Sequence, residues 1–164
     1  MSSNEQVVKK QALPERSLKS RAVAYLSRRE HSRAELIQKL STHEPDTSKI
    51  TTLLDQLSRE GWQSDERFAA SVVNAKSPRQ GRALIAQSLR QKGVEKSLIE
   101  TISQDLAQTE YSRACEVWVR RFGHKPPDFT PQAYAKQARF LVARGFSPEL
   151  VRRVLAHQRS QPND

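Results

Sequence analysis

The side chains that most often carry enzyme chemistry are few and scattered in this sequence. The four histidines form neither an H-x-x-x-H nor an H-E-x-x-H pattern; they are His31, His43, His124 and His157. The adjacent Asp65 and Glu66 cannot face each other across a substrate, and they suit the first turn of a helix, where negative charge is favourable. A glycine-rich phosphate loop is absent. The sequence therefore predicts a protein that is not an enzyme and that needs no metal or cofactor.

The one cysteine, Cys115, has a structural explanation. It shares a helical face with aromatic residues spaced four, three and four positions apart: Tyr111, Cys115, Trp118 and Phe122. This spacing predicts a stripe of core residues rather than a reactive thiol.

Positive charge is the chemical feature that is harder to dismiss. Lys and Arg number 28 against 18 Asp and Glu, a net charge of +10, and residues 109–159 hold 10 cations against 4 anions. Any one of these cations could simply be a solvated surface residue, but together they favour a polyanionic partner. We expect the partner or DNA to be bound by Arg79, Arg82, Arg90, Lys92, Arg120, Arg121, Lys136, Arg139, Arg144 and Arg152.

Helical spacing dominates from Leu18 onward and predicts an all-α fold without a sheet. Ser32 and Glu35 form a capping-box pattern, and a hydroxyl residue precedes proline at the expected helix starts 77–78, 130–131 and 147–148. An L-x-x-x-G-φ pattern occurs three times, at 57–62, 89–94 and 141–146. It predicts Schellman caps, in which glycine ends the helix in the left-handed conformation.

These signals predict nine short helices in three tandem three-helix units, giving an elongated and curved molecule. The expected helices are 18–30, 32–41, 47–60, 65–76, 79–92, 95–107, 109–122, 131–144 and 147–159. The expected organisation is a mobile polar tail at 1–17, units at 18–61, 62–108 and 109–159, and a tail at 160–164. One irregular helical domain is the alternative.

The compartment follows from what the sequence lacks. One cysteine cannot form an intramolecular disulfide, no apolar run approaches the length of a membrane span, and residues 1–14 are too polar for a signal peptide. We expect a cytoplasmic protein that does not contact a membrane.

Four segments together resemble the RecX family of bacterial regulators of the RecA recombinase. They are HSRAELIQKL at 31–40, GWQSDERFA at 61–69, GRALIAQSLRQKGV at 81–94 and KQARFLVARGF at 136–146. The resemblance spans residues 18–157 and implies a curved protein of tandem three-helix units. Gln137 departs from the family pattern and blurs which face of its helix is buried.

The resemblance also implies a function in DNA repair, recombination and the SOS response. It implies a protein that binds the RecA filament on single-stranded DNA and inhibits its strand exchange, ATPase and co-protease activities. Weak direct DNA binding is a further expectation, and we expect a monomer because an open row of units needs no self-association. Lys92, Arg139 and Arg144 match basic positions of the family motifs, whereas Asp65 and Arg67 are expected to hold helix starts and the geometry between units. The alternative is a general single-stranded nucleic-acid-binding module without RecA specificity.

Overall fold

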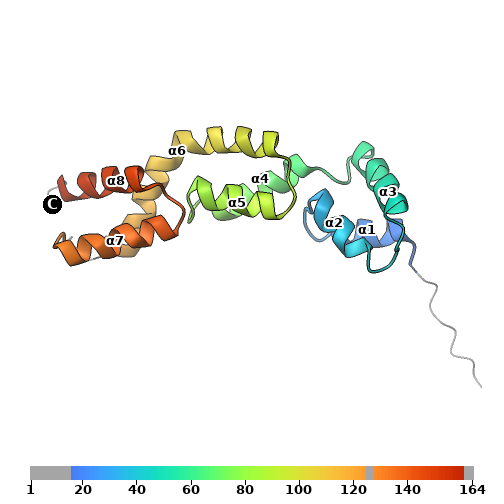
Figure 1. The fold of residues 1–164 in the computed structure, drawn as a ribbon, viewed down its shortest axis with the longest axis horizontal. Helices are drawn as coiled ribbons and strands as arrows, with labels where there is room; N and C mark the ends of the chain where they lie inside the picture. The colour runs from blue at the N-terminus through green and yellow to red at the C-terminus, as the bar shows by residue number, and fades with distance from the viewer. Residues whose placement is uncertain (1–15, 125–127, 161–164) are drawn as a thin grey trace, which may run out of the picture.

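The computed structural model describes residues 16–124 and 128–160, which form eight α-helices and no strand (Figure 1). The helices are α1 (Leu18–Leu26), α2 (Arg33–Leu40), α3 (Thr47–Arg59), α4 (Asp65–Lys76), α5 (Arg82–Gln91), α6 (Lys96–Phe122), α7 (Pro131–Ala143) and α8 (Pro148–Ser160). They form an elongated, arched row, and the predicted all-helical class is confirmed. The predicted tails, 1–17 and 160–164, lie almost wholly outside the described residues.

Three separate hydrophobic cores follow one another along the row. The first is enclosed by α1–α3 around Leu36 and Leu54, the second by α4, α5 and the first half of α6 around Ile85 and Leu89. The second half of α6 encloses the third core together with α7 and α8, around Trp118. We call these groups the first, second and third units. Each helix buries only one stripe, which is how a chain of modest apolar content forms a stable row.

The prediction of nine helices is wrong at one place, because the expected sixth and seventh helices are one helix, α6, of 27 residues. Residues 105–111 (DLAQTEY) contain neither glycine nor proline, so nothing ends the helix there. Leu106, Glu110 and Ala114 are buried in succession, which carries the inward face from the second unit into the third. The limits of the units themselves stay a prediction.

The expected helix start at Ser77-Pro78 is also wrong. Ser77 is the C-cap of α4, and the amides of Arg79 and Gln80 donate to the Lys76 carbonyl. Helix α5 begins only at Arg82, with Gly81 as its N-cap. Proline just after a helix end is common because it cannot continue the helix. The other starts hold: Ser32 and Glu35 form a complete capping box, and the Thr130 hydroxyl accepts from the Ala133 amide.

The three Schellman caps are confirmed. Gly61, Gly93 and Gly145 have φ of 78°, 71° and 88°. The next amides, of Trp62, Val94 and Phe146, donate to the carbonyls of Leu57, Leu89 and Leu141 at 2.8, 3.1 and 3.3 Å. Val94 and Phe146 are buried as expected, but Trp62 is 45% exposed and does not close its cap with a buried contact.

Adjacent units meet through the ends of their middle helices, α2, α5 and α7, which follow one another along the lower side of the row in Figure 1. At the first joint the Ser32 hydroxyl donates to the Lys92 carbonyl at 2.7 Å. At the second joint the Gly81 amide donates to the Arg144 carbonyl at 2.7 Å. In both, the N-terminus of one middle helix therefore meets the C-terminus of the middle helix in the next unit.

An acidic side chain completes each joint. The Asp65 carboxylate accepts from the Arg33 amide at 2.8 Å, and the Glu110 carboxylate accepts from the Arg82 amide at 2.8 Å. Both amides belong to the first residue of a middle helix, where backbone donors have no partner within the helix. The negative charge also suits the positive end of the helix dipole.

Glycine is required at the joints because the backbones approach closely. A Cβ at Gly81 would collide with the Gly145 carbonyl, and one at Gly93 would lie 2.5 Å from the Ala34 Cβ. A Cβ at Gly145 would lie 2.8 Å from Leu84 Cγ, whereas one at Gly61 would meet nothing within 4 Å. The glycines therefore serve two purposes, conformation at all three caps and close approach at the joints.

Comparison of Gly145→Ala with Gly61→Ala tests this distinction. Both variants place alanine at positive φ, which costs about 1 kcal/mol, and only Gly145→Ala adds the steric conflict at the joint, for a total of about 3 kcal/mol. Urea unfolding followed by circular dichroism measures both free energies. Equal losses for the two variants would show that the joint tolerates a larger residue.

Candidate functional site

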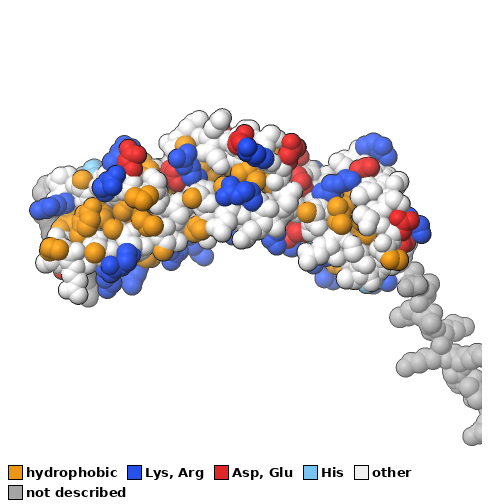
Figure 2. All heavy atoms as spheres, viewed as in Figure 1, with side chains coloured by type: hydrophobic (Ala, Val, Ile, Leu, Met, Phe, Trp, Pro, Cys, Tyr) orange, Lys and Arg blue, Asp and Glu red, His pale blue; other side chains and the backbone are white. Residues whose placement is uncertain are grey.

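The ten predicted binding residues divide into three groups by what they contact. Arg82 and Lys92 form ion pairs at the joints. Four arginines, Arg79, Arg120, Arg121 and Arg144, line one hollow. The other four are exposed and lie outside that hollow: Arg90, Lys136, Arg139 and Arg152. Figure 2 shows Lys and Arg side chains gathered along the lower edge of the second and third units.

Lys92 is committed to the first joint. Its Nζ lies 2.9 Å from Glu35 Oε1, and Arg29 Nη1 lies 3.1 Å from Glu35 Oε2. The Glu35 side chain is only 9% exposed. Burial raises the pKa of this carboxyl, but hydrogen bonds and charges from Arg29 and Lys92 outweigh burial and lower the pKa to about 2. Glu35 is thus a buried carboxylate held by two half-exposed cations, and its ion pair with Lys92 connects the first and second units.

Arg82 has the corresponding place at the second joint. Its Nε lies 3.0 Å from Glu110 Oε2, and the Glu110 side chain is 5% exposed. Because its partner is buried, the charge of Arg82 is largely neutralised within the protein. The sequence pointed to Arg82 as a binding residue without revealing Glu110, which lies 28 positions away.

The arginine pocket is the hollow that Arg79, Arg120, Arg121 and Arg144 line together with Val117 and Phe140. Its volume is about 210 Å³. The turn after α4 supplies Arg79, the end of α6 supplies Arg120 and Arg121, and the C-cap of α7 supplies Arg144. The structure thus brings together four predicted residues from three segments of the chain.

Three of the four guanidinium groups of the arginine pocket contact neighbouring groups of the protein. The Arg144 guanidinium lies 5.0 Å from the centre of the Phe140 ring, and that of Arg121 lies 5.6 Å from the Phe122 ring, both distances suited to cation–π contact. Arg120 donates to the Pro78 carbonyl. Ordered guanidinium groups lose less conformational entropy when they bind a ligand.

Arg113 holds the turn that carries Arg79, and the sequence did not predict this role. Its guanidinium donates to the carbonyls of Ser77, Gln80 and Leu106 at 3.1, 2.8 and 3.1 Å. Burial lowers the pKa of Arg113, and the nearby carboxylates of Glu110 and Glu116 oppose this. The turn that carries Arg79 is thereby tied to α6. Nothing in the sequence around Arg113 distinguishes it from a surface arginine.

The polar Gln137 is also explained. It is buried on α7, accepts from Trp118 Nε1 at 2.8 Å and donates to the Asp128 carbonyl at 2.8 Å. Gln137 therefore provides a hydrogen-bond acceptor for the buried indole N–H of Trp118 in the third core. The predicted core stripe around Cys115 packs in that core, and burial raises the pKa of the Cys115 thiol, which keeps it protonated at neutral pH.

The arrangement is suited to binding anions. Guanidinium forks match carboxylate and phosphate oxygens, and the apolar floor of Val117 and Phe140 offers contact to a ring or an aliphatic group. Within residues 16–124 and 128–160, no group of three or more His, Cys, Asp or Glu side chains could hold a metal ion. None of the helices described there is long and apolar enough to cross a membrane.

Comparison with known proteins agrees with the division into units. Residues 19–57, 64–101 and 108–155 match the first, second and third three-helix domains of RecX. The Regulatory protein RecX of Ralstonia nicotianae is 45% identical over 146 residues, covering 88% of this chain and 91% of that protein. That of Leptothrix cholodnii is 46% identical over 142 residues, covering 87% and 89%.

A solved structure shows the same fold. The crystal structure of RecX from Lactobacillus salivarius superposes with a TM-score of 0.73 at 19% identity, covering 87% of this chain and 94% of that chain.

The free energy of unfolding should decrease as the pH is lowered through the range in which Glu35 becomes protonated. The folded-state pKa of about 2 lies below the ordinary value of 4.5. The contribution of Glu35 is therefore present above about pH 4.5 and is lost as the pH falls toward 2, a loss of about 2 kcal/mol. Urea unfolding between pH 7 and pH 2 measures it. The profile of Glu35→Gln should be flatter by that amount, and profiles that run parallel would contradict this role.

Substitution of the joint and surface cations should separate structural from free charges. Arg82→Gln leaves the buried Glu110 carboxylate without its cation, so we expect a loss of about 2 kcal/mol. Arg139→Gln, on the exposed face of α7, should change stability by less than about 0.5 kcal/mol. Thermal unfolding at constant pH compares them, and equal losses would mean that Arg82 is not a structural residue.

Proposed function

This chain belongs to the RecX family of non-catalytic regulatory proteins, and on that premise we propose that it binds the RecA nucleoprotein filament and inhibits its recombinase, ATPase and co-protease activities. The observation that carries the proposal is the arginine pocket, set on an elongated row of helices. A filament on single-stranded DNA is a long, repeating and anionic surface. A row of units suits it better than a compact domain would.

The shape supports binding at several points at once. Because the units are fixed end to end by the joints, contact by one unit brings the others to the filament at high effective concentration. Individually weak contacts then add up to useful affinity. The net charge of +10 steers the approach and makes the interaction sensitive to salt.

The free cations define the face that we expect to meet the filament. Arg79, Arg121 and Arg144 converge in the arginine pocket, and Lys136 and Arg139 are exposed on α7 of the same unit. Lys92, which the resemblance favoured, is better explained as a joint residue because Glu35 binds it. We therefore give the third unit the main share of the contact.

A general single-stranded nucleic-acid-binding module is the second candidate. The contact of Arg144 with the Phe140 ring favours it, since guanidinium groups and aromatic rings are the groups on which unpaired bases stack. Competition with an excess of unrelated single strands, in the presence of RecA filaments, discriminates the two. A RecA-specific regulator still inhibits RecA in the presence of the competitor, whereas a general module is bound by the competing strands and no longer inhibits RecA.

Charge reversal in the pocket tests the proposed function. Adding the protein to RecA on single-stranded DNA should suppress ATP hydrolysis. The Arg79→Glu/Arg121→Glu double variant should need at least about tenfold more protein for half inhibition, equivalent to about 1.4 kcal/mol.

The matched control is Arg28→Glu/Arg59→Glu, which makes the same change of net charge at exposed positions of the first unit. It should shift half inhibition by no more than about twofold, with the helicity of all variants unchanged. Equal effects of the two pairs would mean that net charge alone matters. Failure of the unmodified protein to inhibit RecA would exclude the function.

A further inference from the structure

An apolar groove between α4 and α6 lies apart from the arginine pocket. Val73 of α4 lines it together with Leu98, Ile102 and Leu106 of α6, and its volume is about 320 Å³. The acidic side chains of Glu66 and Asp105 stand at its rim. We call it the α4–α6 groove.

The groove is an uncovered edge of the second core. Val73, Leu98 and Ile102 pack against the buried cluster around Ile85 but remain partly exposed. The second unit has only α4, α5 and half of α6 to enclose its core, so one side is left open between two helices. Clustered apolar surface of this kind marks interaction sites more often than scattered exposed residues do.

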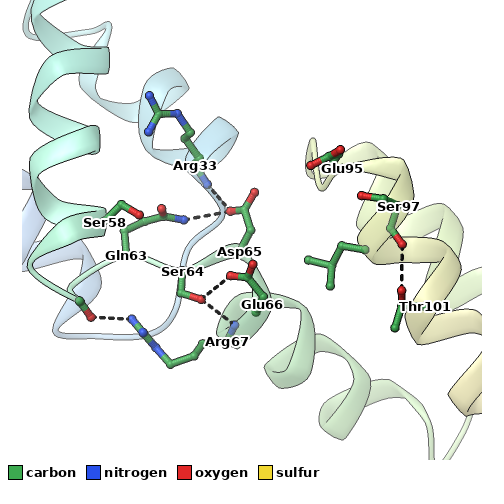
Figure 3. A pocket seen from close by; sticks show the side chains of 12 residues that line it. Arg33, Ser58, Gln63, Ser64, Asp65, Glu66, Arg67, Glu95, Ser97 and Thr101 are labelled. Carbon is green, nitrogen blue, oxygen red and sulfur yellow. Dashed lines mark hydrogen bonds between the residues drawn. The ribbon is translucent and has the colours of Figure 1, made fainter.

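The groove continues into a polar cleft beside the first joint. Glu66 and Leu98 line both, and the cleft has a volume of about 670 Å³. In Figure 3, Glu95, Ser97 and Thr101 of the α6 side face Asp65 and Glu66 of α4 across this cleft. The apolar stretch therefore ends at a wall of carboxylates and hydroxyls.

The charge of this surface is opposite to that of the protein as a whole. Among the ion pairs of residues 16–124 and 128–160, none includes Glu66, Glu95 or Asp105. All three are exposed. Arg33 and Arg67 line the adjoining cleft, but among the residues that the structure describes the α4–α6 groove itself is lined by two carboxylates and by no Lys or Arg, so it repels phosphate and attracts cations. Nucleic acid is thus a poor occupant, and a positively charged protein segment is a suitable one.

We propose that the α4–α6 groove binds an amphipathic helix of a partner protein, with apolar residues at i and i+4 and with Lys or Arg on both flanks. A groove between two helices accepts a third helix by the same packing that forms a helical bundle. The apolar side chains fill the space over Leu98 and Ile102, and the flanking cations lie against Glu66 and Asp105. The partner is bound on a surface that differs in charge from the arginine pocket, so the protein can hold it while bound to a filament.

The test uses full-length protein with labelled methyl groups and two sets of synthetic peptides of about 14 residues, long enough to form a helix when bound. Both sets carry Leu at i and i+4, one with Lys on the flanks and the other with Glu. Lys-flanked peptides should shift the methyl signals of Val73, Leu98 and Ile102. Their Glu-flanked counterparts should bind at least about tenfold more weakly.

Two exposed, isosteric substitutions connect the binding to the rim. Glu66→Gln/Asp105→Asn should weaken the Lys-flanked peptides by about fivefold. The control Glu116→Gln/Glu149→Gln, which removes the same charge from the third unit, should weaken them by less than about twofold.

Four results would overturn the proposal. They are no binding by any Lys-flanked peptide, equal binding of both sets, signal changes centred on the arginine pocket, and equal effects of the two double variants. The proposal would also be overturned if another segment of this chain, or a second copy of it, occupied the α4–α6 groove. A shift of the Leu98 and Ile102 signals when residues 1–15 are deleted would identify that segment as the occupant. Dissociation of a dimer by Glu66→Gln/Asp105→Asn, measured by sedimentation, would identify a second copy.

Discussion

The whole row depends on the meeting of helix ends at the two joints. A helix leaves amides without partners at its start and carbonyls without partners at its end. Here the start of α2 meets the end of α5, and the start of α5 meets the end of α7, so backbone groups at each end find partners in the neighbouring unit. The positive end of each dipole faces the negative end of the next, and a carboxylate, from Asp65 or Glu110, accepts from the amide of the first residue of the helix. The helices must therefore point the same way, which fixes the shape of the molecule.

The joints also decide which charges remain for partners. Lys92 and Arg82 are bound to buried carboxylates, whereas Arg79, Arg121 and Arg144 surround a hollow with an apolar floor. Composition alone cannot distinguish the cations that are paired at the joints from those that line the arginine pocket. The anionic filament and the basic helix that we propose as partners would bind different surfaces of one molecule, since one surface collects guanidinium groups and the other collects exposed carboxylates.

Local signals in the sequence predicted local structure well. The three Schellman caps and the capping box of Ser32 follow from residues within six positions of each other, and all four are formed. Errors arose where one residue is compatible with two structures, and where a helix end was expected although no residue breaks the helix. Pro78 follows the end of a helix instead of starting one, and no residue near Thr109 breaks α6. The contacts of Glu110 with Arg82 and of Arg113 with Ser77 join residues 28 and 36 positions apart, so periodicity and composition could not reveal them. The sequence predicted the cations of the arginine pocket, but it could not show that they surround one hollow together with Phe140.

The unbroken course of α6 has a mechanical consequence. Its 27 residues span about 40 Å, and the two halves are embedded in different cores. Twisting the third unit against the second would require twisting a continuous hydrogen-bonded helix, whereas the first unit is connected to the second by the short segment 60–64 and by the polar contacts of the first joint. Torsional stiffness is thus unequal along the molecule. A torque applied at the C-terminal end reaches α4 and α5 directly through the backbone hydrogen bonds of α6, whereas it reaches the first unit only through the segment 60–64 and the polar contacts of the first joint.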